Sequence, residues 1–390
     1  MSNIDHLKQA FEEIYHQSAE RTFFSPGRIN LIGEHTDYNG GHVFPCAITI
    51  GTYGLVSMRE DKWVHCYSTN FSESGIIQIN LENLAYAKQD GWANYVKGML
   101  KYMQAASQPF SHGFNLLIEG NIPNGAGLSS SASLEMLVGV IADAIYDLKM
   151  DRIKMVKIGQ QVENKFIGVN SGIMDQFAIG MGQVDQAIFL DVNTLDYQFI
   201  PADFKDYRIL IMNTNKRREL ADSKYNERRS QCEAALEQLK TELKINTLGD
   251  LDNESFEANR YLIQDPILAQ RAKHAVYENT RTIAAKALLQ AGDLEKFGQL
   301  LNESHISLRD DYDVTGIELD TLVESAWKHE AVLGARMTGA GMGGCAIALV
   351  QKDAIDEVSE SIKQDYEAKI GYPPSFYIAQ VGDGSKELTN

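Results

Sequence analysis

The segment of this chain richest in reactive side chains is Ser25–Gly41, SPGRINLIGEHTDYNGG, which carries Arg28, Glu34, His35 and Asp37 within a short span. Carboxylates accept hydrogen bonds from hydroxyl groups, while histidine and asparagine side chains can donate or accept them. Such a density of polar groups suits a loop that binds a polyhydroxylated ligand. By composition alone, however, a polar surface turn is the commoner explanation of such a segment.

A second segment, Pro123–Ser133 or PNGAGLSSSAS, lies between an expected strand and an expected helix. Gly125 and Gly127 let the backbone approach a ligand closely, and the N-terminus of the following helix presents free N–H groups to anions. Three consecutive serines add hydroxyls for phosphate oxygens or a metal ion. The chain contains no G-x-x-x-x-G-K-[ST] sequence, which argues against P-loop chemistry. A serine-rich helix cap explains the segment equally well.

Two further segments are weaker signals. Gly339–Gly344, GAGMGG, formally satisfies G-x-G-x-x-G, but a dinucleotide site needs a helix after that motif, and Cys345–Val350 is strand-like. A tight glycine turn is therefore the better interpretation. Asn170–Gln176, NSGIMDQ, places Asp175 just after a Ser-Gly turn, where a single aspartate usually caps a helix or lies exposed on it.

Hydrophobic spacing predicts the elements that must position these segments. Strands are expected at 43–51, 53–59, 63–69, 75–81 and 113–120 and later at 345–350 and 375–381, and helices at 128–148, 151–166, 225–239, 271–290 and 316–329. Asp151 is a plausible N-cap of the second helix. Strands followed by helices indicate an α+β protein of two lobes, which we divide into residues 1–190 and 191–390.

Charge and cysteine content restrict the class of protein. Thirty-six basic and 53 acidic residues leave a net charge of −17, which disfavours nucleic acid and anionic membranes as partners. No apolar run approaches the length of a membrane span. The four cysteines are scattered without a C-x-x-C pair, as expected of reduced thiols. We therefore expect a cytoplasmic protein that binds neither nucleic acid nor membranes.

Taken together, the glycine-bearing segments resemble the galactokinases. GRINLIGEHTDYNGG is similar, almost letter for letter, to the signature of that family. PNGAGLSSSAS and RMTGAGMGGC resemble the phosphate loop and the C-terminal glycine motif of the wider superfamily of galactokinase, homoserine, mevalonate and phosphomevalonate (GHMP) kinases. The segments occur in the expected order between Phe24 and about Val381. The resemblance implies a two-lobed α+β GHMP-kinase fold, with a mixed sheet in the N-terminal lobe and the active site in the cleft.

The resemblance also implies a role for each matching residue. Arg28 and Asp175 would be catalytic, with Asp175 next to the anomeric hydroxyl of the sugar. The implied sugar-binding residues are Glu34, His35, Thr36, Asp37, Gly172, Asp175 and Tyr225, and the implied ATP-binding residues are Ser68, Gly125, Ala126, Gly127, Leu128, Ser129, Ser130 and Ser131. Ser131 and Glu163 would coordinate Mg²⁺, which takes oxygen ligands.

The activity implied by this resemblance is ATP-dependent phosphorylation of galactose to α-D-galactose 1-phosphate, with Mg²⁺ as cofactor. We expect a monomer whose partners are galactose and MgATP. Two alternatives stay open. One is a related sugar 1-kinase that acts on N-acetylgalactosamine or arabinose, and the other is a galactose sensor without turnover. The complete set of Arg28, Ser131, Glu163 and Asp175 argues against the sensor.

Overall fold

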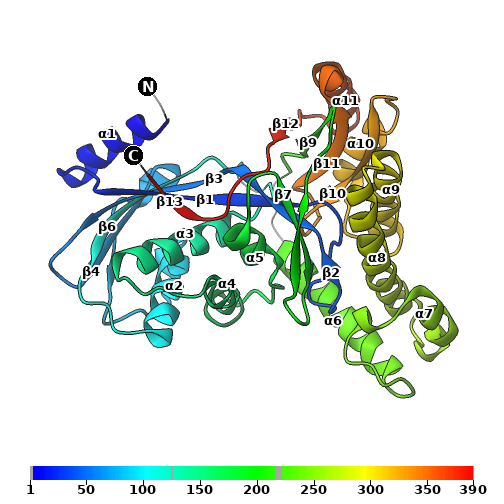
Figure 1. Cartoon of the computed structure of the whole chain (residues 1–390), viewed down its shortest axis with the longest axis horizontal. Helices are drawn as coiled ribbons and strands as arrows, with labels where there is room; N and C mark the ends of the chain where they lie inside the picture. Colours follow the sequence, from blue (N-terminus) through cyan, green and yellow to red (C-terminus); the bar gives the residue numbers. More distant parts are fainter. Residues whose placement is uncertain (1–2, 124–125, 217–220, 390) are drawn as a thin grey trace.

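The computed structural model describes residues 3–123, 126–216 and 221–389, which form two lobes side by side (Figure 1). The first lobe is built on a six-stranded sheet of order β13-β1-β3-β6-β4-β5. Its strands are β1 Arg21–Asn30, β3 Pro45–Met58, β4 Trp63–Ser68, β5 Ile77–Asn80, β6 Phe114–Gly120 and β13 Lys386–Leu388. Because β4 and β6 run parallel while their neighbours pair antiparallel, the sheet is mixed, as predicted.

Helices cover both faces of this sheet (Figure 1). They are α1 Asn3–Tyr15 on one face, and α2 Ala93–Ala106, α3 Ser130–Ile145, α4 Arg152–Gln161 and α5 Met174–Met181 on the other. Successive side chains of a strand point to opposite faces of the sheet, so one strand packs against helices on both sides. Leu117 of β6 packs with Phe11 of α1, whereas the adjacent Leu116 belongs to the core that contains Leu137 of α3.

The second lobe has a four-stranded antiparallel sheet of order β10-β11-β9-β12, covered by long helices. The strands are β9 Tyr207–Asn213, β10 Val332–Thr338, β11 Cys345–Gln351 and β12 Ser375–Ala379. The helices are α6 Ala221–Leu239, α7 Asn253–Asn259, α8 Pro266–Ala291, α9 Leu294–Asp310, α10 Gly316–Ala326 and α11 Ile355–Ile370. The predicted two-lobed α+β fold is confirmed.

A small sheet of β2 His42–Val43, β7 Gln186–Asp191 and β8 Tyr197–Pro201 lies between the lobes (Figure 1). β2 follows the polar segment after β1, and β8 pairs with β7. At the other end of the chain, β13 pairs with β1 in the first sheet. The C-terminal strand thus lies beside the strand that leads into the polar segment. The division at residues 190 and 191 stays a prediction.

Two expected strands, 43–51 and 53–59, are one continuous strand, β3. The expected break between residues 51 and 53 is therefore wrong, and Gly51 serves packing inside the strand. A Cβ at Gly51 would overlap the Ser25 carbonyl and Pro26 of β1, beside the bulge in the β1–β3 register between Pro26 and Arg28. The glycine allows two strands to approach closely at a bulge, so it does not end the strand.

Helix α2 is not among the predicted elements, and its glycine is part of the reason. Gly98 lies mid-helix, where glycine is unfavourable by roughly 1 kcal/mol relative to alanine. A Cβ there would lie 2.6 Å from Val162, so the glycine permits close packing of α2 against the segment that follows α4. The N-cap of α4 is confirmed, because the Asp151 side chain accepts a hydrogen bond from the Lys154 N–H at 2.9 Å.

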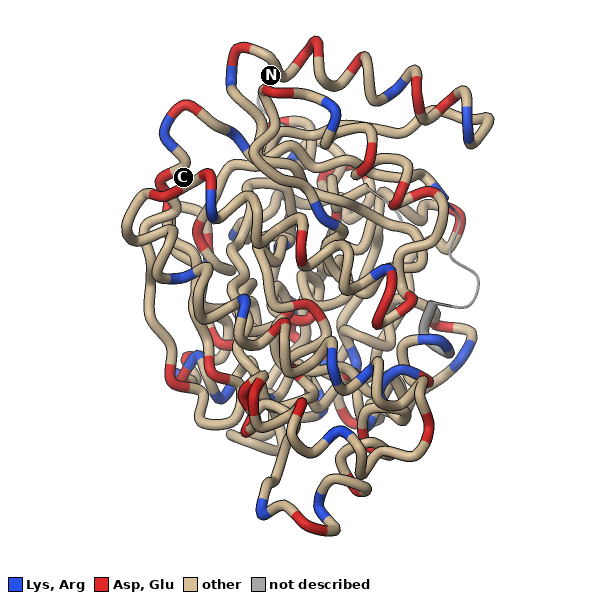
Figure 2. Tube along the Cα trace, turned by 90° about the vertical axis from the view of Figure 1, so that its right-hand side faces the viewer, with Lys and Arg blue, Asp and Glu red and all other residues tan. Residues whose placement is uncertain are grey.

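The charge distribution agrees with the excess of acidic residues. On the side seen in Figure 2, Lys and Arg are interspersed with Asp and Glu and form no continuous basic stripe. Within the described ranges, no helix combines the length and apolar character needed to cross a membrane. The four cysteines are free and buried.

Candidate active site

The predicted site residues converge on one cavity of about 270 Å³. Its walls come from the segment after β1, the loop before α3, the turn before α5, helix α6 and the turn between β10 and β11. The predicted residues that line it are Arg28, Glu34, His35, Asp37, Ala126, Gly127, Leu128, Ser129, Ser130, Ser131, Glu163, Gly172, Asp175 and Tyr225. Gly125, also predicted, falls outside the residues that the structure describes.

Arg28 and Asp175 form the central contact of this cavity. Arg28 Nε and Nη2 donate to the two carboxylate oxygens of Asp175 at 2.8 and 2.9 Å, a bidentate ion pair. Arg28 Nη1 donates to the Gly127 carbonyl at 2.7 Å. Burial alone would lower the pKa of Arg28, but the carboxylates of Asp175 and Glu34 more than offset this and raise it. The guanidinium therefore joins the first turn of α5 to the loop before α3.

The loop before α3 turns sharply into the helix. Gly127 has φ 70° and Ser129, the residue before α3, has φ 63°, both in the left-handed region. The Arg28 N–H donates to the Leu128 carbonyl at 3.2 Å, and a Cβ at Gly27 would lie 2.8 Å from that oxygen. The Ser129 hydroxyl donates to the Asp175 carboxylate. This loop therefore packs directly against β1 and presents the N-terminus of a 16-residue helix to the cavity.

The glycine turn at 339–344 connects β10 to β11, so the interpretation as a turn is confirmed, and a strand follows it where a dinucleotide site would need a helix. Gly339 has φ 85°, and a Cβ there would lie 2.9 Å from the Gly127 carbonyl. The third glycine segment therefore packs on the second.

Asp37 is held over Gly172, whose missing side chain makes room for it. A Cβ at Gly172 would overlap the Asp37 carboxylate. The backbone N–H groups of Met174 and Tyr38 hydrogen-bond to that carboxylate. Even so, burial, followed by the negative charge of Asp175, raises the pKa of Asp37 to about 7.

His35 and Tyr225 form an aromatic wall of the cavity. Their ring centroids lie 5.5 Å apart, and the Tyr38 hydroxyl lies 2.7 Å from His35 Nδ1. Burial lowers the pKa of His35 to about 3, so the imidazole is neutral at pH 7. Burial also raises the pKa of Tyr225, and Asp37 raises it further, which keeps the phenol protonated. Both rings thus present neutral polar groups.

Thr36, predicted to bind the sugar, lies inside the loop. Its hydroxyl oxygen is 2.8 Å from the Gly33 carbonyl and 2.6 Å from the His42 carbonyl, so it braces the turn between β1 and β2. Its position suits a structural role behind the cavity wall. A direct contact of Thr36 with the sugar stays a prediction.

Ser131 and Glu163 meet on one side of the cavity. The Ser131 hydroxyl donates to Glu163 Oε1 at 2.9 Å, and the Ser171 hydroxyl donates to Glu163 Oε2. Glu163 lies in a π-helical turn, Val162–Ile167, a distortion that is frequent at functional sites. Burial raises the pKa of its carboxyl, while the two serines oppose that shift. A hydroxyl and a carboxylate are hard oxygen ligands, so this pair fits Mg²⁺.

A second cavity of about 220 Å³ adjoins the first and shares Tyr95, Ile122, Ser130 and Ser131 with it. Ser68, the last residue of β4, lies in this second cavity together with Trp92. The Trp92 indole nitrogen is buried without a hydrogen-bond partner. Sequence analysis missed Trp92 and Tyr95, because they lie at the N-cap and in the first turn of α2, a helix that was not predicted.

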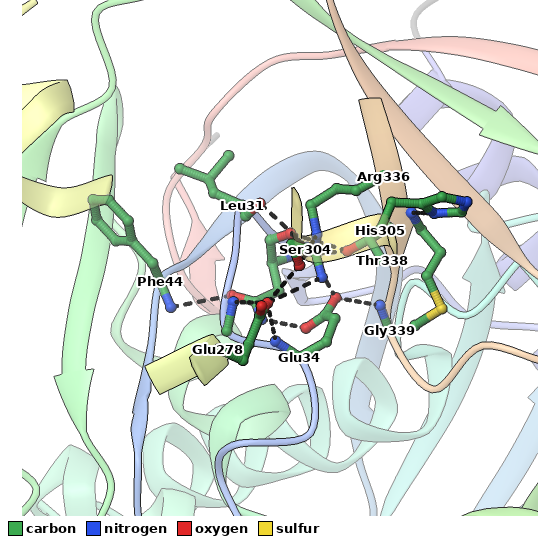
Figure 3. A network of polar contacts seen from close by, with 12 residues as sticks. Leu31, Glu34, Phe44, Glu278, Ser304, His305, Arg336, Thr338 and Gly339 are labelled. Carbon is green, nitrogen blue, oxygen red and sulfur yellow. Dashed lines mark hydrogen bonds and ion pairs between the residues drawn. The ribbon is translucent and has the colours of Figure 1, made fainter. Parts of the chain in front are cut away.

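Sequence analysis also missed the buried charges behind Glu34. Arg336, Glu278 and Ser304 surround the Glu34 carboxylate and its backbone (Figure 3). Arg336 lies three residues before Gly339, within the quoted glycine motif, and that position was the available signal. Glu278 is the one carboxylate of α8, but it lies outside the glycine segments, so nothing in its sequence context linked it to Glu34.

Models of known families match three parts of this chain. The galactokinase galactose-binding signature matches residues 9–58, the GHMP kinases N terminal domain matches 94–183, and the GHMP kinases C terminal domain matches 284–368. The mevalonate kinase of Methanococcus jannaschii superposes with a TM-score of 0.65 at 19% identity, covering 93% of this chain and 98% of that one, which shows the shared fold. Fold and site together define a GHMP kinase.

The more similar relatives narrow the class. The galactokinase of Ligilactobacillus salivarius is 59% identical over 382 residues, 98% of this chain and 99% of that protein. The galactokinase of Streptococcus mutans is 58% identical over 383 residues, 98% of each. The structure of Lactococcus lactis galactokinase complexed with galactose has a TM-score of 0.97 at 55% identity, covering 99% of this chain and 100% of that one. The chain belongs to the galactokinase family and is an ATP-dependent kinase.

Because the pKa of Asp37 is raised, we predict that the free energy of unfolding depends on the ionisation of this residue. The folded protein binds this proton more tightly than the unfolded chain, where the pKa is near 3.8. The free energy of unfolding contributed by Asp37 therefore falls as pH rises from about 4 to about 7, and the full cost is present above that range. We expect Asp37→Asn to raise Tm, and to raise it more at pH 8 than at pH 5, in differential scanning calorimetry.

Asp147→Asn is the matched control, because Asp147 is exposed in the loop that follows α3. Its effect on Tm should be small and similar at both pH values. An equal gain in Tm at pH 5 and pH 8 for Asp37→Asn would contradict the assigned titration.

Proposed function

We propose that this kinase transfers the γ-phosphoryl group of MgATP to the anomeric hydroxyl of galactose, giving α-D-galactose 1-phosphate and ADP in the cleft between the lobes. The observation that carries the proposal is the placement of the Arg28 guanidinium. It contacts the Asp175 carboxylate on one side and the Gly127 carbonyl of the loop before α3 on the other. A group at that point lies between a sugar-binding pocket and a phosphate-binding loop.

Arg28 supplies fixed positive charge where the transferred phosphoryl group passes. Phosphoryl transfer depends mainly on positioning and on neutralising charge, and a preorganised cation stabilises the transition state without reorganisation. Arg28 is 4% exposed, and Asp175 and Gly127 fix the direction of its fork. Its charge therefore acts in a partly water-excluded site, where electrostatic interactions are stronger than in bulk water.

Asp175 accepts the proton of the anomeric hydroxyl. Each carboxylate oxygen can accept about two hydrogen bonds. Oδ1 accepts from Arg28 Nε, and Oδ2 accepts from Arg28 Nη2 and Ser129, so Oδ1 has acceptor capacity for the sugar. The side chain is about one-third exposed, on the wall of the cavity. This supports a general base that Arg28 and Ser129 hold in a single orientation.

Glu34, His35, Asp37 and Tyr225 bind the hydroxyl groups of the sugar. They offer carboxylates, a neutral imidazole and a phenol from two elements, on converging walls of one cavity. Directed hydrogen bonds of this kind discriminate epimers, because a misplaced hydroxyl leaves both itself and a buried protein group unpaired. This favours galactose over its C4 epimer, glucose.

Ser131 and Glu163 would hold Mg²⁺, which when bound neutralises charge on the ATP phosphates. The chain positions these two groups 2.9 Å apart, at the start of α3 and in the π-helical turn. The loop before α3 binds the phosphates through its backbone and its serines. The second cavity, with Ser68, Trp92 and Tyr95, suits the flat adenine ring.

We also propose a cytoplasmic location, which the four free, buried cysteines support. A monomeric state stays a prediction that size-exclusion chromatography with light scattering would test. The sensor alternative is tested by ADP release in the presence of galactose, because a sensor would bind galactose without producing ADP.

The role of Asp175 is tested by Asp175→Asn. We expect kcat to fall by at least about 10²-fold, the low end for a lost general base, while calorimetry shows largely retained galactose binding. Arg28→Ala should also lower kcat, because its charge acts mainly in the transition state. A near-normal kcat for Asp175→Asn would remove that residue from the mechanism, and a pure KM effect for Arg28→Ala would contradict its assigned role.

The metal assignment is tested by Glu163→Ala. Removing one carboxylate from the shell of a hard cation should raise the Mg²⁺ concentration for half-maximal rate, and excess Mg²⁺ should partly restore activity. Glu357→Ala, which removes an exposed carboxylate of α11, is the control. An unchanged Mg²⁺ titration in Glu163→Ala would show that Glu163 is not a ligand.

Sugar specificity is tested with galactose, glucose, N-acetylgalactosamine and arabinose in parallel. Sites built to bond a hydroxyl reject analogues by about 10⁴-fold or more, so kcat/KM for galactose should exceed that for glucose by at least roughly 10³, allowing for water bridging. Asp37→Ala should narrow this ratio by impairing galactose more than glucose. Comparable kcat/KM values for the two sugars would overturn the assignment to galactose.

A further inference from the structure

The second lobe holds the Glu34 carboxylate in place. Glu34 is 1% exposed, and its Oε1 accepts from the Gly339 N–H at 2.5 Å and lies 3.5 Å from Arg336 Nη1. Its Oε2 accepts from the side-chain amide of Asn30. Burial raises the pKa of Glu34, and the charge of Arg336 is the strongest influence that opposes the shift. The position and charge of Glu34 thus depend on a residue from β10.

Arg336 fixes the backbone as well as the carboxylate. Its Nη1 lies 3.1 and 3.2 Å from the carbonyl oxygens of Asn30 and Leu31, and its Nε donates to the Ser304 hydroxyl at 3.1 Å. The side chain is wholly buried, and Figure 3 shows its guanidinium pointing into the group around Glu34. The Arg336 guanidinium therefore contacts Asn30 at the end of β1, Leu31 after it, and helix α9 of the second lobe through Ser304.

Glu278 of α8 completes the arrangement from the other side. Its Oε1 accepts from the Gly33 N–H at 3.1 Å and the Ser304 hydroxyl at 2.6 Å, and it lies 3.8 Å from Arg336 Nη2. Its Oε2 accepts from Arg281 Nε at 2.8 Å. Burial would raise the pKa of Glu278, but Arg281, His274 and Arg336 bring it to about 2. The buried, ionised carboxylate of Glu278 thus accepts a hydrogen bond from the N–H of Gly33, the residue before Glu34.

Stability alone does not explain why Arg336 and Glu278 are buried as charged groups. A buried ion pair is expensive to desolvate, and hydrophobic residues of similar volume often replace one without loss of stability. Here Arg336 and Glu278 each hydrogen-bond to the backbone of residues 30–33, next to a carboxylate that lines the sugar cavity. Their contacts match a role in orienting that carboxylate.

We propose that Arg336 and Glu278 are positioning residues that set sugar affinity and specificity by fixing the backbone of residues 30–34 and aiming the Glu34 carboxylate into the cavity. This inference rests on the proposed sugar site. Neither residue touches the sugar. The second lobe thereby determines the geometry of a binding loop that begins in the first lobe.

The experiment compares Arg336→Met, Arg336→Lys and Glu278→Gln with Glu34→Gln, and uses Arg152→Met as a matched control. Arg152 of α4 is a partly buried arginine that donates to the Ser385 carbonyl at 2.8 Å, and it is not among the residues that line the sugar cavity. For each variant, calorimetry gives the Kd for galactose, steady-state kinetics gives KM for galactose and ATP, and scanning calorimetry gives Tm. A panel of monodeoxygalactoses measures the cost of losing each hydroxyl.

We expect Arg336→Met to weaken galactose binding by at least about tenfold, the size of a lost hydrogen bond to a charged group, with the KM for ATP changed less than about twofold. Arg336→Lys, which keeps the charge but not the fork, should recover part of the affinity. The deoxy sugar whose penalty disappears in Glu34→Gln should also lose its penalty in Arg336→Met and Glu278→Gln. Arg152→Met should lower Tm while galactose affinity stays the same.

Unchanged galactose affinity in Arg336→Lys and Glu278→Gln would overturn the inference, and so would equal losses for galactose and ATP. If Arg336→Met does not fold, these two variants carry the test. If Glu34→Gln itself binds galactose and every deoxy sugar like the unmutated protein, the proposed sugar site is wrong and the inference fails with it. Normal discrimination in the Arg336 and Glu278 variants beside an impaired Glu34→Gln would overturn the inference alone.

Discussion

The bidentate contact between Arg28 and Asp175 is the interaction on which the rest of the site depends. It joins β1 to α5, elements 147 residues apart in the chain, and the third guanidinium nitrogen reaches the loop before α3. A planar fork with fixed donors restricts both the distance and the angle between its partners. Three separate segments must therefore come together in one geometry, with positive charge at the centre of the cavity.

Glycine positions make this geometry sterically possible. The loop before α3 packs on β1 at Gly27, the turn between β10 and β11 packs on that loop at Gly339, and Gly172 makes room for Asp37. At each position a Cβ would lie within 3 Å of a neighbouring atom. The glycines of the motifs therefore serve mainly close packing between segments, in addition to any contact that the backbone makes with a ligand.

The cavity concentrates acidic groups that would be more stable in water. Burial raises the pKa of Glu34, Asp37 and Glu163, and their serine, arginine and backbone partners offset the shifts only in part. Such groups are expected at a binding site, where function opposes the most stable arrangement. Bound sugar hydroxyls and a bound cation would give these carboxylates hydrogen-bond and ionic partners in addition to those within the protein.

The sequence by itself determined the α+β fold class and the three glycine segments, and the resemblance of those segments to the galactokinases indicated most residues of the cavity. It also indicated the helix start at Asp175 and the cap at Asp151. Tertiary structure alone decided that the Thr36 hydroxyl turns into its own loop and that Arg336 and Glu278 stand behind Glu34. The Thr36 bonds are local, but residue type alone does not say whether a threonine hydroxyl faces a ligand or a neighbouring carbonyl. The contacts of Glu278 with Gly33 and of Arg336 with Glu34 span 245 and 302 positions, so they leave no local pattern in the sequence.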